Sequence, residues 1–551
     1  MICPHCNETT GTQYFKDGVG QCTECKRVIL YEMSDKEQNQ IKLPGTGKLI
    51  SEFTEEITTI IKDKDKLFYK VDAKEIVEIG QIITDEETKK IYTGFIEMKP
   101  SRFITLIEEY LTPGIIVKTR EGECFASKSI SKDLASTMLA SSILENALPQ
   151  ITRIFTVPIP IIYNGELTFP KKGYDKRFNS WMPNNAPEIT NQEMTIEEAK
   201  EIFKQIFQEF CFEEQQDYYN ALAALMTPFI KGLFTKFNKR SPVFFYLANR
   251  ERAGKDYMAG ITGLIYEGNS IEESAISTGE RGNNTEELRK KIMSALITGR
   301  KRMHFSNNRG YIDNAIFEGI ITSETHSDRI LGKNDILTFD NELDFSLSGN
   351  TGVGFTADLA NRCIIIRLLL NMENANERQF NNPNLHGWIL ENRETILSAL
   401  YALIKNWIEK GKPKGSKPFA SFPEWSSICG GIMEAAGYGN PCVIDKSIGE
   451  NSGDVETKHM KELFELCNDL HGETPISKNA IVNVVQENEL FPFLDLDNNR
   501  SDQTKFGTML TKFVRRTLSD ITLVVDDPNK RGSRREYKFS KDCVAQSQLE
   551  F

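Results

Sequence analysis

The sequence predicts a multidomain α/β protein. The chain has 551 residues, and at about 100 to 200 residues per domain this length corresponds to about three to five units. Strands and helices alternate between Ser241 and Leu370, as in a doubly wound nucleotide-binding sheet. Patterns on both sides of this stretch predict smaller units of other types. The expected units are residues 1–32, 49–190, 195–371, 372–453 and 454–551.

The composition is that of a globular chain, with 39% hydrophobic and 26% charged residues. No apolar run approaches the about 20 residues that a membrane span needs. The N-terminus has neither the basic nor the apolar segment of a secretion signal, so we expect the cytosol. The net charge of -11 argues against a protein that coats nucleic acid over its whole surface. Any contact with nucleic acid must be local, in a channel or on one basic face.

Two C-x-x-C pairs lie within residues 1–32 and predict a zinc ribbon. Four thiolates from two turns match the tetrahedral geometry of a structural Zn²⁺, and so short a module cannot fold on apolar burial alone. The alternative, a redox pair, lacks the surrounding strand and helix pattern of a thioredoxin-like unit. The predicted zinc ligands are Cys3, Cys6, Cys22 and Cys25.

Residues 49–190 follow a polar linker and predict an α+β N-terminal domain, or collar. Short alternating runs surround a helical segment after Pro100, a further helix is expected from Lys132 to Leu148, and Asn164-Gly165 predicts a hairpin turn. The segment Lys171 to Phe178 mixes basic and aromatic residues. Such a segment can hold single-stranded nucleic acid, but a solvated loop with one docked aromatic is the commoner outcome.

Residues 195–371 begin with two predicted helices and then read as a buried strand, a loop and a helix start, with Gly254-Lys255 at the junction. In a phosphate-binding loop, backbone N–H groups and the helix N-terminus surround an anion while the lysine adds charge. Asn249 stands where the pattern G-x-x-x-x-G-K-[ST] has glycine, and Asp256 stands where it has a hydroxyl residue. The expected nucleotide-binding residues are Asn249, Arg252, Ala253, Gly254, Lys255, Asp256, Ser306 and Asn307.

The segment Arg302 to Asn308 is the best second strand, but it ends in Ser306 and Asn307 where an aspartate is expected. The metal needs oxygen ligands near the β and γ phosphates, but not from a particular element. We therefore hypothesise that Asp256 supplies the magnesium carboxylate and Ser306 the hydroxyl. The alternative is a degenerate site that binds nucleotide without hydrolysing it.

Three more residues are assigned catalytic roles alongside Lys255 and Asp256. Glu324, at the end of a helix, is the preferred acid for polarising the attacking water, with Asp313 and Glu318 as alternatives. Asn350 lies at the end of a strand, where it can hydrogen-bond the γ-phosphate or that water. Arg362 is a candidate arginine finger that acts on the neighbouring subunit. The alternative for each acid is a solvated carboxylate without a catalytic role, and the alternative for Arg362 is a salt-bridged surface arginine.

A hairpin is predicted between Asp328 and Phe339, and its lysine tip is a candidate DNA-gripping finger. Residues 372–453 are mainly helical and are expected to pack over the nucleotide site. Residues 454–551 read as three helices followed by two strands, a winged-helix pattern with a basic third helix and wing; DNA is favoured over protein docking. The expected DNA-binding residues are Arg329, Lys333, Asn334, Lys505, Lys512, Lys530, Arg531, Arg534 and Arg535.

The motifs of the central region are, in chain order, LANRERAGKD, KRMHFSNNRG, RILGKNDILTF, LDFSLSGN and ADLANR. Over roughly residues 149–452 they closely resemble the self-loading replicative helicases of phage-inducible pathogenicity islands and staphylococcal-type cassette chromosomes. These are AAA+ ATPases related to superfamily 3 and MCM helicases. The resemblance implies a hexameric ring that hydrolyses ATP between subunits and threads one DNA strand past Lys333 and Arg329. It also implies 3′ to 5′ unwinding, replication initiation for a mobile element and a winged helix that reads the origin.

The function expected from the sequence is therefore an ATP-dependent replicative DNA helicase and initiator. Its expected cofactors are ATP, Mg²⁺ and Zn²⁺. Its expected partners are single- and double-stranded DNA, further copies of itself in a hexamer, and host replication proteins. One alternative is a DNA-origin scaffold that binds nucleotide without helicase activity. Another is a primase or transcription factor, for which the sequence shows no clustered acidic triad.

Overall fold

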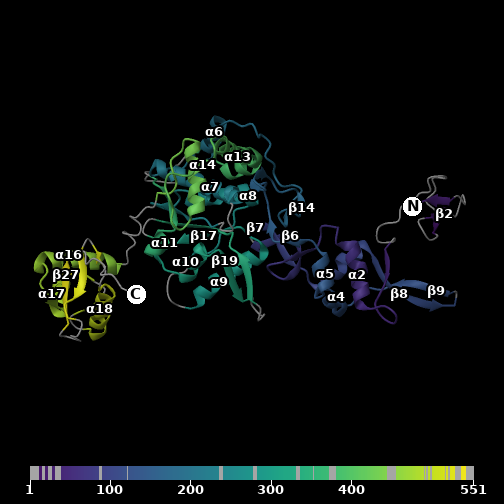
Figure 1. Cartoon of the computed structure of the whole chain (residues 1–551), viewed down its shortest axis with the longest axis horizontal. Coiled ribbons are helices and arrows are strands. Elements are labelled where there is room, and N and C mark those ends of the chain that lie inside the picture. Colours follow the sequence, from purple (N-terminus) through teal and green to yellow (C-terminus); the bar gives the residue numbers. More distant parts are fainter. Residues whose placement is uncertain are drawn as a thin grey trace.

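The structure is a computed structural model and confirms a multidomain, mixed α/β chain (Figure 1). Its hydrophobic residues form several separate cores. The described residues are 12–14, 19–22, 28–30, 39–85, 90–120, 122–234, 240–276, 282–329, 336–350, 353–370, 380–443, 455–488, 490–491, 494, 496, 499–514, 517–518, 521–527 and 535–541.

The N-terminal segment forms an antiparallel sheet of β1 (Thr12–Tyr14), β2 (Val19–Cys22) and β3 (Val28–Leu30). Cys22 ends β2, but its side chain lies outside the described part. The other predicted zinc ligands, Cys3, Cys6 and Cys25, lie wholly outside the described residues.

The N-terminal α+β unit contains two sheets. The first has the order β4-β8-β9 and packs with four helices around one core, while the second has the order β10-β5-β6-β7. The single helix predicted from Lys132 to Leu148 is two helices, because the Ser141 hydroxyl caps a new helix by accepting from Leu144 N (3.4 Å). The elements are β4 (Gln40–Lys42), α2 (Ile50–Ile61), β5 (Phe68–Lys70), β6 (Glu75–Asp85), β7 (Lys90–Glu97), α3 (Pro100–Tyr110), β8 (Thr112–Thr119), β9 (Gly122–Ser127), α4 (Lys132–Leu139), α5 (Ser142–Ala147) and β10 (Gln150–Ile151).

Short strands connect this unit to the central region. The predicted hairpin at Asn164-Gly165 is confirmed as the antiparallel pair β12 and β13. The Lys171–Phe178 segment is part of a small sheet. Phe178 docks edge-on against Tyr163, which agrees with the expectation of one docked aromatic residue. The strands are β11 (Arg153–Ile154), β12 (Ile161–Tyr163), β13 (Glu166–Thr168), β14 (Gly173–Asp175) and β15 (Ser180–Met182).

The central region is built on a four-stranded sheet of order β17-β21-β16-β23, in which every pair is parallel. The predicted alternation of strands and helices is thereby confirmed. The elements are α6 (Ile196–Phe207), α7 (Gln215–Ile230), the 3-10 helix η1 (Lys231–Leu233), β16 (Val243–Ala248), α8 (Lys255–Glu267), α9 (Gly282–Thr298), β17 (Arg302–Asn308), β18 (Tyr311–Ile312), α10 (Ala315–Thr322), β19 (Thr325–Arg329), β20 (Ile336–Asp340), β21 (Asp344–Asn350), β22 (Gly354–Phe355), α11 (Ala357–Ala360) and β23 (Cys363–Leu368).

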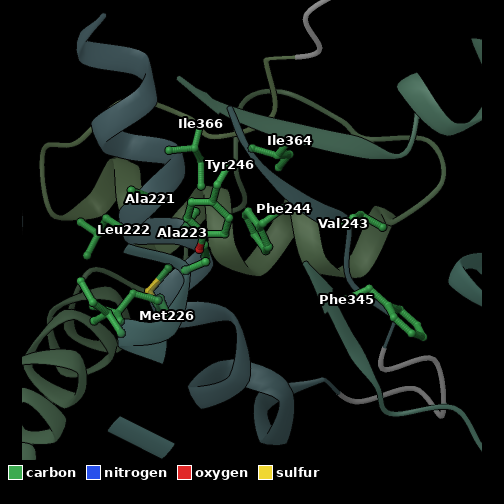
Figure 2. Close-up of a cluster of buried hydrophobic side chains, with 14 of the residues drawn as sticks. Ala221, Leu222, Ala223, Met226, Val243, Phe244, Tyr246, Phe345, Ile364 and Ile366 are labelled. Atoms are coloured by element: carbon green, nitrogen blue, oxygen red, sulfur yellow. The ribbon is translucent and has the colours of Figure 1, made fainter. Parts of the chain in front are cut away.

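Helices cover both faces of the sheet, as a parallel sheet requires. The neighbouring helices α7 and α8 are joined where the Tyr266 hydroxyl donates to Leu225 O (2.9 Å). Figure 2 shows apolar side chains of α7 gathered beside Phe244 and Tyr246 of β16 and Ile364 and Ile366 of β23. On the other side, α10 places Phe317 against Phe305 and Phe345.

The predicted helical region after the sheet consists of α12 (Leu385–Glu391), α13 (Arg393–Glu409) and α14 (Pro423–Ala435). These helices share one hydrophobic core with the sheet and with α6 and α7. Trp425, fully buried, stacks edge-on against Phe244, and its indole N–H donates to Thr227 Oγ1 (3.0 Å). The two ranges 195–371 and 372–453 therefore pack as one body.

The C-terminal unit has its own core and lies apart at one end of Figure 1. Its three helices and final strand pair are confirmed, and the sheet order is β24-β27-β26-β25. The predicted inner face of α18, which includes Phe506 and Leu510, is buried. That helix ends at Lys512, and Thr517–Leu518 pairs with β26. The elements are α16 (Val455–His471), β24 (Ile476–Ser477), α17 (Lys478–Glu487), α18 (Arg500–Lys512), β25 (Thr517–Leu518), β26 (Ile521–Val525) and β27 (Glu536–Ser540).

Among the helices of the described residues, none is long and apolar enough to cross a membrane.

Candidate functional site

The loop of residues 249–254 lies at the carboxyl edge of the parallel sheet. It follows β16, whose residues are all buried, and it leads into α8. Arg252 and Gly254 have left-handed backbone conformations, with φ of 62° and 96°. The first N–H groups of α8 point out of the helix end and favour an anion. In open α/β sheets ligands bind at this edge, where strand order reverses beside the first strand.

Asn249 anchors this loop. Its Nδ2 donates to Leu370 O (3.2 Å) and its Oδ1 accepts from Leu370 N (2.9 Å), so the side chain ties the loop to the residues that follow β23. A glycine could not make this tie, which accounts for the departure from the glycine pattern. The Asn249 side chain is therefore engaged by the backbone rather than directed at a phosphate.

Asp256 connects the loop lysine to the neighbouring strand. Lys255 is nearly buried, and its Nζ lies 2.9 Å from Asp256 Oδ2. The other carboxylate oxygen, Oδ1, accepts a hydrogen bond from the hydroxyl of Ser348, a fully buried residue of β21. The Ser348 oxygen in turn accepts from Asn307 N (3.3 Å). The ammonium of Lys255, the carboxylate of Asp256 and the hydroxyl of Ser348 thus meet at the start of α8.

The hydroxyl beside Asp256 belongs to Ser348, not to Ser306 as the sequence hypothesis has it. Because β21 lies between β16 and β17, its side chains are the ones that face the start of α8. The Ser306 hydroxyl lies 3.5 Å from Glu273 O, on the outer side of β17. The predicted exchange of groups is therefore corrected to a pair formed by Asp256 and Ser348.

The end of β17 contributes an amide rather than a carboxylate. The pairing register shifts between Phe305 and Asn308, and Asn307 has a left-handed φ of 56° there, with an exposed side chain. Asn308 is buried, and its Oδ1 accepts from Ile276 N (2.9 Å) while its Nδ2 donates to two backbone carbonyls. The Asn307 amide is thus the one that remains accessible at this edge.

Asn350 lies at the end of its strand, as the sequence predicts. It ends β21, directly opposite Ala248 of β16. Its Oδ1 is buried and has no hydrogen-bond partner among the described residues. A buried acceptor without a partner is unusual and indicates a donor supplied by a ligand or an ordered water.

His304 is a buried neighbour that the sequence reasoning missed. Its Nδ1 lies 2.9 Å from Ser346 Oγ on β21. Burial, and then the positive charge of Arg302, lower the pKa of His304 to about 3, against a smaller opposing effect of Asp256. The imidazole is therefore neutral at physiological pH. The sequence signal for His304 was the alternation of polar side chains at Arg302, His304 and Ser306, which places them on one face of a buried strand.

An apolar cavity of about 230 Å³ adjoins the loop. Phe210 lies so close that a Cβ at Gly254 would be 3.4 Å from its ring. Tyr257 of α8 is stacked on His386 of α12, with ring centroids 3.5 Å apart and planes within 3°. An apolar cavity with aromatic side chains at its wall suits a flat ring. The lining residues that the sequence reasoning missed are Glu209, Phe210, Tyr257, Phe380, Asn382, Pro383 and Leu385.

Glu324 does not lie at this site. Its carbonyl accepts from Asn341 N (2.9 Å), and Asn341 precedes β21, so Glu324 is at the amino edge of the sheet. Its carboxylate is 3.9 Å from Arg240. The prediction that Glu324 polarises water beside Lys255 of the same chain is therefore wrong, because the helix before it ends on the far side of the sheet.

Arg362 also lies at the amino edge. Its carbonyl accepts from Val243 N (3.0 Å) at the start of β16, and five residue steps of about 3.3 Å separate Val243 from Ala248 beside the loop. The guanidinium contacts Asp358 (2.6 Å) and donates to Glu318 O (2.5 Å). Arg362 can therefore reach a phosphate only at the site of another subunit.

The predicted DNA-binding residues are partly described. Arg329 is exposed at the end of β19, and the confirmed hairpin joins it to β20, while Lys333 and Asn334 at the tip lie outside the described residues. Lys505 is exposed on α18 and paired with Asp502 (3.0 Å). Arg535 directly precedes β27. The side chain of Lys512, and all of Lys530, Arg531 and Arg534, lie outside the described part.

No family model and no curated protein matches the chain. Among solved structures, the apo C-terminal region of NrS-1 is 12% identical, with 83% of this chain and 84% of that chain covered and a TM-score of 0.36. The JCV helicase bound to a thiazolopyridinyl-phenoxyphenyl acetamide is 12% identical, with coverages of 44% and 68% and a TM-score of 0.20. Likenesses at these TM-scores assign no function to this chain.

Proposed function

We propose that this chain is an ATP-dependent DNA helicase that hydrolyses ATP at the loop of residues 249–254. The observation that carries the proposal is the placement of Asp256, in contact with both Lys255 and Ser348, at the carboxyl edge of a parallel sheet and beside an apolar cavity. An anion site, a cation and an apolar cavity in one place suit the phosphates and the base of a nucleoside triphosphate.

In the proposed site the N-terminus of α8 and the Lys255 ammonium hold the phosphates, and the cavity lined by Phe210 and Tyr257 holds the base. The carboxylate of Asp256 and the hydroxyl of Ser348 are oxygen donors that fit Mg²⁺, which uses one or two carboxylates plus substrate phosphates. When bound, Mg²⁺ supplies positive charge that neutralises the phosphate oxygens. Lys255 then exchanges its contact with Asp256 for one with the phosphates.

Asn307 and Asn350 supply the polar groups for the attacking water. The unpartnered Oδ1 of Asn350 can accept a hydrogen bond from that water, and the exposed Asn307 lies near the end of the neighbouring strand. Oriented amides can position a nucleophile in phosphoryl transfer, because the loose transition state asks for alignment more than for a strong base.

DNA is the proposed partner at two places. The hairpin of β19 and β20 carries Arg329, and Lys333 lies between the two strands in the sequence, while the C-terminal unit presents Lys505 outward as a winged-helix domain would. We further propose a hexameric ring and replication initiation for a mobile element, with Zn²⁺ held by the N-terminal cysteines. These finer assignments rest on the resemblance of the sequence motifs.

A strand-displacement assay tests the proposal. The purified chain with ATP and Mg²⁺ is expected to unwind a duplex with a 3′ single-stranded tail and to leave one with a 5′ tail intact. Release of a fluorescent strand gives the rate. Equal unwinding of both substrates would contradict the proposed polarity, and no unwinding despite rapid ATP hydrolysis would contradict the helicase assignment.

The placement of Arg362 gives a second expected result. Replacing it by alanine should lower ATP turnover by about 10³-fold or more if it acts as an arginine finger. Mixing Arg362→Ala with Lys255→Ala subunits should restore part of the turnover, because a mixed interface joins an intact loop to an intact arginine. If Arg362 only supports Glu318 O and Asp358 in its own chain, mixing restores nothing.

One observation favours a second candidate, a DNA-binding scaffold that uses nucleotide for assembly alone. The second strand ends in Ser306, Asn307 and Asn308, so it brings no carboxylate to the site, and the predicted acid Glu324 lies at the other edge. A scaffold of this kind binds ATP and DNA but releases no phosphate.

A further inference from the structure

Lys70 is a buried cation at the end of β5. Its side chain is 1% exposed, and it forms an ion pair with Asp72. Its Nζ lies 5.1 Å from the centre of the Phe95 ring and 4.6 Å from the centre of the Phe339 ring. Burial lowers the pKa of Lys70, and the charge of Asp72 opposes that shift. Burying an ammonium is costly unless it is paired, so a specific arrangement holds it here.

The two rings belong to different units. Phe95 is on β7, in the same N-terminal sheet as Lys70, whereas Phe339 is on β20 at the base of the hairpin. Phe339 is buried and lies opposite His326 of β19. Lys70 therefore fastens the N-terminal sheet to one strand of the hairpin. The other strand is held by the central region, where Arg289 of α9 makes two hydrogen bonds to Asp328 (3.0 and 2.6 Å).

A second contact between the N-terminal unit and this segment is made at Glu342, three residues after Phe339. Arg153 of the N-terminal side donates through Nε to Glu342 Oε2 (3.2 Å), and its Nη2 lies 2.8 Å from Oε1. Lys301 at the start of β17 shares the same carboxylate (2.7 Å). A cavity of about 390 Å³ lies between these two contacts, with Asp72, Arg153, Phe339 and Glu342 in its wall.

The fastened segment runs without interruption from the hairpin to the candidate site. Residues 336–350 comprise β20, a short connection and β21. β21 carries Ser348, which donates to Asp256, and ends at Asn350 with its unpartnered Oδ1. A displacement of the hairpin can therefore be transmitted along this continuous segment to Ser348 and Asn350 beside the phosphate loop. The N-terminal unit contacts the segment between these two ends, at Phe339 and Glu342.

We propose that Lys70 and Arg153 are positioning residues that fix the segment 336–350, so that the N-terminal unit sets how strongly DNA at the hairpin changes ATP hydrolysis at the loop. The part of this inference that concerns hydrolysis rests on the proposed function. Both residues act through β20 and β21 and not by contact with nucleotide or DNA.

A double-mutant cycle on the full chain tests the proposal. Lys70→Met removes the charge at similar length, and Phe339→Leu removes the ring but stays apolar. Lys66→Met, an exposed lysine four residues earlier, is the matched control. Two quantities are measured for each variant: the ratio of DNA-stimulated to basal ATP turnover, and hydrogen exchange of the backbone amides of β19 and β20.

Each single variant should lower the ratio by about two- to thirty-fold, the range of couplings that travel through packed networks. The double variant should lower the ratio no further than either single variant, because both substitutions remove the same contact between Lys70 and Phe339. Exchange in β19 and β20 should rise, while basal turnover and the Lys66→Met control stay near wild type.

The proposal would be overturned by hairpin exchange that does not change, or by a loss in basal turnover as large as the loss in stimulated turnover. Additive losses in the double variant would also overturn it, since they indicate two separate structural effects. If the wild-type chain shows no ATP turnover at all, the proposed function fails, and hairpin exchange alone decides whether Lys70 fixes the hairpin.

Discussion

Replacing Asp256 by alanine is expected to reduce Mg²⁺-dependent ATP turnover to less than about 1% of the wild-type rate, an effect comparable to losing a key transition-state contact. The Asp256 carboxylate joins Lys255 to Ser348, and the second strand offers only Ser306 and amides in its place. Phosphate release at several Mg²⁺ concentrations measures the effect. Nucleotide should still bind, because the helix N-terminus and the apolar cavity remain.

Ser348→Ala and Ser306→Ala separate the corrected arrangement from the original hypothesis. Ser348→Ala should lower turnover clearly, since its hydroxyl is hydrogen-bonded to Asp256. Ser306→Ala should leave turnover within about two-fold of wild type, as expected for one weak contact to a backbone carbonyl at 3.5 Å. Undiminished turnover in Asp256→Ala, or the opposite ranking of the two serines, would refute the assignment of the magnesium carboxylate to the loop.

Replacing Lys255 by alanine is expected to abolish turnover and also to weaken ATP binding. A charge-assisted contact to a phosphate contributes about 1.5 to 3 kcal/mol, which corresponds to a loss in affinity of about ten- to 150-fold. Binding of a fluorescent ATP analogue and phosphate release measure the two effects. AMP, which lacks the β and γ phosphates, should bind Lys255→Ala and wild type equally.

The Asp256 and Lys255 variants are distinguished by their binding. Asp256→Ala should keep the affinity for ATP without Mg²⁺, whereas Lys255→Ala should bind ATP more weakly both with and without Mg²⁺. Equal losses of affinity in the two variants would indicate that the ion pair between Lys255 and Asp256 is only structural. In that case the loop would have no separate carboxylate function.

Much of the fold follows from local patterns in the sequence. The spacing of Phe506, Met509 and Leu510 predicts a helix with one buried face, and the structure confirms it. Asn164-Gly165 predicts a hairpin turn because both residues accept a left-handed backbone, with observed φ of 52° and 87°. Strand, loop and helix around Lys255 are confirmed for the same reason, since each is specified by residues close together in the chain.

The parts that could not be predicted depend on the order of strands in the sheet. Nothing local to Ser306 or Ser348 says that β21 lies between β16 and β17, yet this order decides which hydroxyl meets Asp256. Glu324 fails for the same reason, because the direction of the preceding helix decides at which edge it lies. The apolar cavity beside the loop joins segments near Phe210, Tyr257 and Phe380, which no spacing rule connects.

The contact between Lys70 and Phe339 also could not be predicted from local sequence. A lysine in the strand pattern of β5 looks like an exposed residue, since lysine is rarely buried. Only the packing of β7 and β20 on either side of its ammonium makes it a contact between units.

Steady-state phosphate release by the full wild-type chain, measured with saturating ATP, decides whether the loop of residues 249–254 hydrolyses ATP. The proposed site predicts turnover that requires Mg²⁺, disappears with EDTA and rises when single-stranded DNA is added. Saturable ATP binding with no phosphate release, with or without Mg²⁺ and DNA, would contradict it and would assign the chain to the scaffold candidate.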